Sequence, residues 1–233
     1  MVNSVSDIKG VLFDFGNTLA YVDEEADRRY REELLSILKA YGYVKTLEDL
    51  FPLLDSAYRS STEGEVRSLY HFWKLFLNKL DMSANQALIR ELQGSRTRHV
   101  DKTFKLYDGV FKVLSTLKER YKLALVSNCA VGLSDVIESL GLTSFFQCIV
   151  LSYEVGVRKP DRRIYLVATQ SLGLQPRDCV FVADEVSDLV GAREVGLKTI
   201  LVHQEKYTTL NDSDLNFTPD LRCDRVSEIL KFF

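Results

Sequence analysis

The sequence has few of the features that would place a protein in a membrane or on nucleic acid. Its 233 residues include no apolar run long enough to cross a bilayer, and residues 1–10 lack the basic end and apolar stretch of a signal peptide. The formal net charge is only -3, which provides no broad basic surface for nucleic acid and no attraction to an anionic membrane. These absences predict a soluble, cytoplasmic protein with neither kind of partner.

Cysteine and histidine are also scarce. The four cysteines include no C-x-x-C pair, and the three histidines are scattered along the chain. This spacing disfavours a metal site built from histidine. It also predicts that the cysteines are buried as small apolar residues in a reducing compartment.

Apolar residues, which make up 46% of the chain, are concentrated in short runs. Five of these runs are continuously apolar and bounded by polar or turn residues, as buried strands are. Helix-like segments at 108–121, 131–141, 162–173 and 187–196 alternate with or follow the later runs. This alternation predicts an α/β fold with a Rossmann-like, doubly wound parallel sheet. The predicted strands are 9–15, 122–128, 146–152, 179–184 and 197–203.

About a hundred residues without a strand signal separate the first predicted strand from the second. They predict an inserted, all-helical cap at 21–99 on a core formed by 1–20 and 100–233. We interpret the aromatic side chains at 70–76 as the packing of this cap, and residues 206–224 as loop before a short terminal helix. The predicted cap helices are 23–42, 46–60, 65–80 and 83–94.

Polar residues that could carry chemistry stand where the predicted strands end. Asp14 ends the first strand, Ser127 the second and Asp184 another, while Lys159 follows the third. Ligands of open parallel sheets bind beyond the carboxyl ends of the strands, so these side chains are expected to converge there. Clustered carboxylates favour a hard cation such as Mg²⁺, and an aspartate can attack phosphorus. The convergence predicts cleavage of a phosphate ester.

Four motifs in this order resemble those of the haloacid dehalogenase-like superfamily. They are DFGNT at 14–18, VSN at 126–128, RKPD at 158–161 and VADEVSD at 182–188. The helical insertion resembles the C1-type cap of that family. The resemblance covers nearly the whole chain and implies a magnesium-dependent phosphatase acting through an aspartyl-phosphate.

The same resemblance implies a role for each motif residue. It makes Asp14 the nucleophile and a magnesium ligand, and it makes Asp188 a further ligand, directly or through water. Asp188 could instead cap the helix that follows, although Ser187 is the better candidate for that cap. The remaining implied roles are metal ligation by the Gly16 carbonyl and by Asp184, support of the loop and of substrate by Thr18, and phosphoryl binding by Ser127, Asn128 and Lys159.

One departure from the family pattern affects the chemistry. Gly16 occupies the place where the family's phosphatases usually carry a second aspartate as general acid and base, a group worth about 10²–10⁴ in rate. Glu185 is the nearest acidic alternative along the sequence. Ala183, where a glycine is common, is a smaller change.

Several functions remain open at this stage. The leading one is hydrolysis of a small phosphorylated metabolite, because a helical cap excludes bulky substrates. A 2-haloacid dehalogenase is favoured by Gly16, since a halide needs no proton, but disfavoured by Asp184, whose charge would repel anions. A phosphomutase, or a binding protein that has lost catalysis, completes the alternatives. The sequence identifies neither the substrate nor the oligomeric state.

Overall fold

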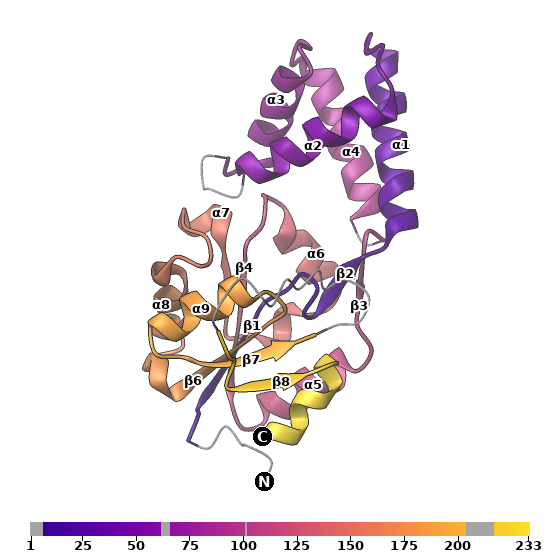
Figure 1. Ribbon diagram of the computed structural model, residues 1–233. Coiled ribbons are helices and arrows are strands. Elements are labelled where there is room, and N and C mark those ends of the chain that lie inside the picture. The colour runs from indigo at the N-terminus through magenta and orange to yellow at the C-terminus, as the bar shows by residue number, and fades with distance from the viewer. Residues whose placement is uncertain (1–6, 62–65, 101, 204–216) are drawn as a thin grey trace.

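The computed structural model describes residues 7–61, 66–100, 102–203 and 217–233. A twisted sheet with helices on both faces forms one part of the molecule, and four helices project from one end of it as a second part (Figure 1). The predicted fold class, a parallel Rossmann-like sheet with an inserted helical cap, is confirmed. Among the described residues, no helix combines the length and apolar character that a membrane crossing requires.

The six-stranded sheet is parallel throughout, in the order β5-β4-β1-β6-β7-β8. The first strand lies near the middle, where Val11 pairs with Leu123 of β4 on one side and with Val180 of β6 on the other. The order of the strands along the chain therefore reverses at β1, and such reversals are where open α/β sheets bind ligands. The strands are β1 (Gly10–Phe13), β4 (Lys122–Ser127), β5 (Cys148–Leu151), β6 (Cys179–Ala183), β7 (Lys198–Val202) and β8 (Leu221–Cys223).

Alternate residues of each strand face opposite layers of the core. In β1, Val11 and Phe13 join the apolar cluster that contains the helices α5 and α6, whereas Leu12 joins the cluster that contains α8 and α9. Both faces are covered, which explains why the strands read as continuous apolar runs. The helices around the sheet are α5 (Val110–Lys118), α6 (Leu133–Ser139), α7 (Ser152–Val155), α8 (Arg162–Ser171) and α9 (Val186–Glu194), with 3-10 turns at Thr143–Phe145, Pro176–Asp178 and Val226–Phe232.

One strand of the sheet was not predicted. We expected loop at 206–224, but β8 lies at the end of that stretch, and 204–216 fall outside the described residues. The strand is held by Asp220, whose Oδ2 accepts hydrogen bonds from the Thr199 backbone N–H and hydroxyl, both at 2.8 Å. Three residues with a charged arginine between two buried ones are too short a pattern to indicate a strand.

The cap consists of α1 (Glu24–Ala40), α2 (Leu47–Ser61), α3 (Leu69–Lys79) and α4 (Gln86–His99). Helix α1 begins at Asp23, whose side chain accepts a hydrogen bond from the Ala26 N–H at 2.8 Å, and acidic residues in its first turn complement the helix dipole. It buries Tyr30, Leu34 and Leu38 on one face. The buried faces of the cap helices belong to the same apolar cluster as Val11 and Phe13 of β1, so the cap packs continuously with one layer of the core.

Aromatic side chains fill the interior of the cap. Phe72, Trp73 and Phe76 are fully buried in α3, as expected of packing residues, whereas Tyr70 is 41% exposed, so the expectation that it packs inside the cap is wrong. The chain enters and leaves the cap through two short antiparallel strands, β2 (Ala20–Val22) and β3 (Phe104–Leu106). Neither strand was predicted, and β2 extends into the stretch 21–99 that was expected to be all helical, because three-residue strands give too short a pattern to detect. This paired ribbon connects the cap to the part of the molecule that carries the sheet.

Candidate active site

The predicted polar residues do converge at the carboxyl edge of the sheet. Asp14 directly follows β1, and its backbone N–H donates to the Val182 carbonyl of β6 at 2.9 Å, which ties the start of the loop to the neighbouring strand. Ser127 ends β4 and is buried, and Asp184 follows β6. All three line one cavity. The sheet therefore brings together residues that are up to 170 positions apart in the sequence.

Lys159 lies at the centre of this group as a buried cation. Its Nζ contacts Asp14 Oδ1 at 2.6 Å and Asp188 Oδ2 at 2.6 Å, and the lysine is only 3% exposed. Burial alone lowers the pKa of a lysine, but the charges of Asp14 and Asp188 outweigh it and raise the pKa above its ordinary value. The ammonium therefore stays charged at neutral pH.

Asn128 holds the backbone of this lysine. Its side-chain oxygen accepts from the Lys159 N–H at 2.7 Å, and its side-chain nitrogen donates to the Lys159 carbonyl at 3.0 Å. Sequence reasoning assigned Asn128 to phosphoryl binding. In the structure, both ends of its amide are engaged with Lys159, which indicates that the asparagine positions the lysine.

The turn that carries Lys159 also packs closely against α9. At Gly191 a Cβ atom would lie 2.2 Å from the Pro160 carbonyl oxygen, closer than any side chain can approach. Tyr165 of α8 donates a hydrogen bond from its hydroxyl to the Asp188 carbonyl at 2.7 Å. Helices on the far side of the turn thus determine where the lysine and its acidic partner lie.

The prediction that Ser187 or Asp188 caps the N-terminus of α9 is wrong. The helix begins after Glu185, whose side chain makes no capping hydrogen bond, and the Ser187 hydroxyl donates to Glu185 Oε1 at 2.6 Å instead. Asp188 is buried and paired with Lys159, so it has an electrostatic role that a helix cap would not need.

Two carboxyl groups of the site hold their protons more tightly than usual. Burial, and then the charge of Asp14, raises the pKa of Asp184 to about 7. Burial also raises the pKa of Asp188 to about 6, with Lys159 opposing the shift. Three carboxylates face one ammonium, so the ionised group carries excess negative charge. A cation among them would relieve that repulsion.

The oxygen atoms around Asp14 fit Mg²⁺, which keeps several waters, better than they fit a metal ion that needs all its ligands from the protein. No cluster of three acidic, histidine or cysteine side chains in the described part of the chain is arranged to enclose a metal. Mg²⁺ typically uses one or two carboxylates and keeps several waters. Asp14 and Asp184, which line the same cavity, could supply those carboxylates. Lys159 pairs with Asp14 as closely as it does with Asp188, so this pairing does not decide which of the two would bind the ion.

The loop after Asp14 leaves room at the position that lacks the second carboxylate. A Cβ atom on Gly16 would meet nothing within 4 Å, and the backbone there is not in the left-handed region. Thr18 is fully buried and donates from its hydroxyl to Asp184 Oδ1 at 3.3 Å. Thr18 therefore supports a carboxylate of the site, and Gly16 is not required by the backbone.

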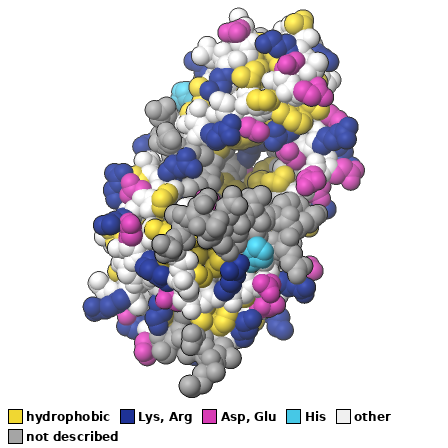
Figure 2. Space-filling view, viewed as in Figure 1, with side chains coloured by type: hydrophobic (Ala, Val, Ile, Leu, Met, Phe, Trp, Pro, Cys, Tyr) yellow, Lys and Arg dark blue, Asp and Glu magenta, His cyan; other side chains and the backbone are white. Residues whose placement is uncertain are grey.

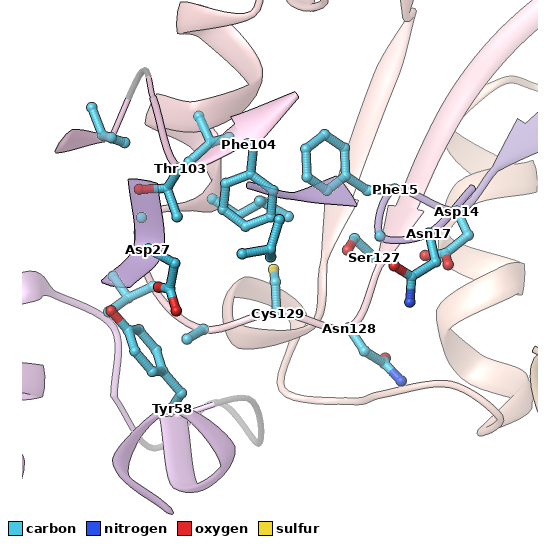
Figure 3. A pocket seen from close by; sticks show the side chains of 18 of the residues that line it. Asp14, Phe15, Asn17, Asp27, Tyr58, Thr103, Phe104, Ser127, Asn128 and Cys129 are labelled. Atoms are coloured by element: carbon cyan, nitrogen blue, oxygen red, sulfur yellow. The ribbon is translucent and has the colours of Figure 1, made fainter. Parts of the chain in front are cut away.

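A cavity of about 510 Å³ extends from this centre to the cap. Figure 2 shows a hollow between the helical part and the sheet-bearing part of the molecule. In Figure 3, Asp14 and Ser127 lie at one side of the pocket, Asp27 and Tyr58 at the other, and Phe104 between them. The cavity is within the size range of small-molecule sites, and its two polar ends are separated by an apolar middle.

Sequence reasoning missed the cap residues of this cavity. Asp27, Tyr58 and Arg96 line it, although they come from three different helices. In the sequence they are ordinary charged or aromatic positions on amphipathic helices, and nothing distinguishes them from a solvated face. Only the packing of the cap against the core identifies them.

The fold and the site together define an α/β enzyme with an acidic centre at a strand end and a helical cap above it. Residues 11–202 match the family model described as haloacid dehalogenase-like hydrolase, and the chain belongs to that family. It is 29% identical over 231 residues to a protein named glyceraldehyde 3-phosphate phosphatase from Methanopyrus kandleri, with 96% of each chain covered.

Other relatives cover nearly the full length as well. The chain is 25% identical over 224 residues to the pyrophosphatase PpaX of Halalkalibacterium halodurans, covering 92% of this chain and 95% of the relative. The solved structure of a 2-haloacid dehalogenase from Pseudomonas syringae superposes with a TM-score of 0.75 at 20% identity, covering 97% of each chain. At that identity the likeness shows the fold and not the reaction.

Because α9 packs so closely on Pro160 at Gly191, a substitution at Gly191 is expected to displace Lys159 while the fold stays intact. We expect Gly191→Ala to push the turn that carries Lys159 outward and to lower kcat/KM by about 10²-fold, the cost of displacing a catalytic group by about 1 Å. Steady-state hydrolysis of an aryl phosphate and a circular dichroism spectrum would measure both effects.

Gly94 is the matched control for this substitution. It also lies within a helix, but a Cβ atom there meets only the flexible end of Arg98 at 3.2 Å. Gly94→Ala should retain activity within about twofold of the wild type. If Gly191→Ala were equally active, the close packing would not position Lys159.

Proposed function

We propose that this protein is a magnesium-dependent phosphatase of small phosphorylated metabolites that acts through a phosphorylated Asp14. The observation that carries the proposal is the buried group in which Lys159 contacts Asp14 at 2.6 Å beside Ser127 and Asp184. Support also comes from curated relatives named as phosphatases of small phosphorylated compounds. In this proposal residues 1–20 and 100–233 form the catalytic core, and 21–99 the cap.

Each polar group would have a separate task in the first step. An Asp14 oxygen attacks phosphorus, the new oxygen–phosphorus bond forms, and the bond to the ester oxygen of the leaving group breaks. Lys159 and the Ser127 hydroxyl would hold phosphoryl oxygens, since a buried ammonium is a strong counter-charge. A bound magnesium ion, held by Asp14, Asp184 and the Gly16 carbonyl, would neutralise charge on the phosphoryl group.

The second step would return the free enzyme. A water oxygen attacks phosphorus, the bond to Asp14 breaks, and inorganic phosphate leaves after the water has lost a proton to solvent. The cap covers the cavity and limits it to the leaving group and a few waters. Proton transfer is the weak point of both steps, because Gly16 places no carboxylate beside Asp14.

The shape of the cavity indicates what the leaving group would contain. The space beside Asp14 is followed by Phe15, Phe104 and Cys129, and the polar cap residues lie beyond them. A leaving group with an apolar body and a hydrogen-bonding end would match these surfaces, because its body would lie against the apolar side chains and its end would reach the polar cap residues. A three-carbon phosphate would leave much of the 510 Å³ unfilled.

A 2-haloacid dehalogenase is the alternative, and it is less compatible with the site. Its substrate carboxylate and its halide product are both anions. Asp184 and Asp188 lie beside Asp14, and the single ammonium of Lys159 pairs with Asp14 and Asp188, so the excess negative charge of a metal-free site would repel both. Lack of an acid at Gly16 is the single feature that favours this reaction.

The carboxylates of the site make activity dependent on a divalent cation. We expect EDTA to abolish hydrolysis of an aryl phosphate and Mg²⁺ to restore it. Raised pKa values of about 7 for Asp184 and about 6 for Asp188 mean that protons compete with the cation. The magnesium concentration that gives half-maximal rate should therefore increase as pH falls from about 8 to about 6. Halide release from a haloacetate in the presence of EDTA would instead support the dehalogenase.

The assignment of Asp14 as the nucleophile predicts complete loss of activity in Asp14→Asn. The metal-free variant should remain folded and be about as stable as the wild type. Lys159 keeps Asp188 as a partner, and one of three carboxylates is removed. Aryl phosphate assays and thermal unfolding without metal would measure this. Activity within a few fold of the wild type would show that another group attacks phosphorus.

The space at Gly16 makes it possible to install the missing acid. Gly16→Asp should raise turnover of alkyl phosphates more than that of aryl phosphates, because an alkoxide needs a proton more than a phenoxide does. The gain could approach the low end of general-acid effects, about 10²-fold. The open surroundings of Gly16 remove the main structural objection to this variant. An unchanged ratio of alkyl to aryl turnover in a folded variant would show that proton transfer does not limit the reaction.

A further inference from the structure

Arg96 of the cap helix α4 makes contacts with the core that no catalytic role requires. Its Nη2 donates to the Gly132 carbonyl at 2.6 Å, and its Nη1 pairs with Asp135 Oδ2 at 2.9 Å. Only 11% of the arginine side chain is exposed, whereas half of the Asp135 side chain is. The guanidinium is therefore held in a defined place at the boundary between cap and core.

The backbone of the core is shaped to receive this guanidinium. Gly132 has a φ of 98°, a conformation that glycine adopts most readily, and a Cβ atom there would lie 2.2 Å from Arg96 Nη2. A side chain at 132 would thus occupy the space in which the arginine reaches the carbonyl. The fit depends on both residues, one from each part of the molecule.

The contacted loop follows β4 directly. It begins after Ser127, includes Asn128, and ends at Gly132, the residue before α6. Cys129 within this loop is fixed to the core, because its N–H donates to Ser152 Oγ at 3.0 Å. Arg96 and the loop both line the cavity. The arginine therefore connects the cap side of the cavity to the core side.

We propose that Arg96 fastens the cap to the Gly132 loop and so determines which substrates the cavity admits. With the contact in place, a leaving group must fit inside the closed cavity. When the contact is broken, the cap can separate from the loop about the β2–β3 ribbon, and longer leaving groups reach Asp14. The substrate readout rests on the proposed phosphatase activity, whereas the contact itself does not.

The experiment compares two substrates with the same phenolic leaving group. Phenyl phosphate fits within 510 Å³, and a phosphotyrosine peptide of about ten residues does not. The selectivity ratio is kcat/KM for phenyl phosphate divided by kcat/KM for the peptide. Asp135→Asn should lower this ratio about threefold, the effect of a half-exposed ion pair, and Arg96→Lys about tenfold or more, because a hydrogen bond to the carbonyl is also lost.

Asp135→Asn is the cleaner of the two variants, since Asp135 does not line the cavity and its side chain is half exposed. Arg28→Ala is the matched control, because Arg28 pairs with Glu32 on the cap surface and that pair includes no core residue.

The dependence of the selectivity ratio on salt concentration provides a further test. A higher salt concentration should screen the pair of Arg96 with Asp135 and so lower the selectivity ratio of the wild type and of Arg28→Ala, but not that of Asp135→Asn.

Small-angle scattering of the metal-free proteins tests the contact without any activity. We expect a larger radius of gyration for Arg96→Lys and Asp135→Asn than for the wild type and Arg28→Ala. Unchanged selectivity together with unchanged scattering in both variants would overturn the proposal. Failure of the wild type to hydrolyse phenyl phosphate would contradict the phosphatase function, and the scattering result would then decide the role of Arg96 alone.

Discussion

The charge of Lys159 is the constraint on which the active site depends. A buried ammonium is costly unless it is paired, and this one contacts Asp14 and Asp188 at 2.6 Å each. The pairing brings Asp14, the proposed nucleophile at the end of β1, close to Asp188 in the first turn of α9. Removal of either carboxylate takes one of these two partners from the lysine, and removal of the lysine takes from Asp14 and Asp188 the ammonium that pairs with both.

The surrounding structure serves to hold that lysine in place. Asn128 binds its backbone on both sides, and Gly191 allows α9 to approach the following proline. Tyr165 of α8 donates a hydrogen bond to the Asp188 carbonyl and so holds the start of α9 in place. These contacts come from three parts of the fold, namely the loop after β4, α8 and α9. They explain why a short motif around residue 159 is sufficient to place a cation at the edge of a sheet built elsewhere in the chain.

Excess negative charge links the site to its chemistry. Asp14, Asp184 and Asp188 exceed the single ammonium, and burial keeps water from screening them. Burial is the main cause of the raised pKa values of Asp184 and Asp188, and repulsion by Asp14 adds to it. That repulsion would favour a bound divalent cation, and the cation and Lys159 could then hold the charges of a phosphoryl group. The one element that does not fit a complete phosphatase is Gly16, and the open space around it shows that packing does not impose this residue.

Much of the core could be predicted from the sequence because its signals are strong and local. The first predicted strand, at 9–15, contains β1 at Gly10–Phe13, and the run at 197–203 contains β7, since both are buried on two faces and read as continuous apolar segments. Strand β8 could not be predicted, because its position depends on Asp220 and not on its own three residues.

The site was predictable only in part, for a similar reason. Asp14, Ser127 and Lys159 follow strands whose ends a parallel sheet must bring together, so their convergence follows from the topology. The dual engagement of Asn128 with Lys159 and the contact of Arg96 with Gly132 depend on the packing of loops and of the cap. No periodicity or spacing in a single sequence encodes such contacts.

The most direct test of the account is to trap the covalent intermediate. The protein with Mg²⁺ would be mixed with an aryl phosphate, quenched in acid during the first turnovers, and digested for mass spectrometry. The account predicts one phosphoryl group on the peptide that contains Asp14. The fraction trapped should be high, because Gly16 lacks the carboxylate that would activate water in the second step. A phosphoryl group on another residue, or full turnover with no phosphorylated peptide at any quench time, would contradict it.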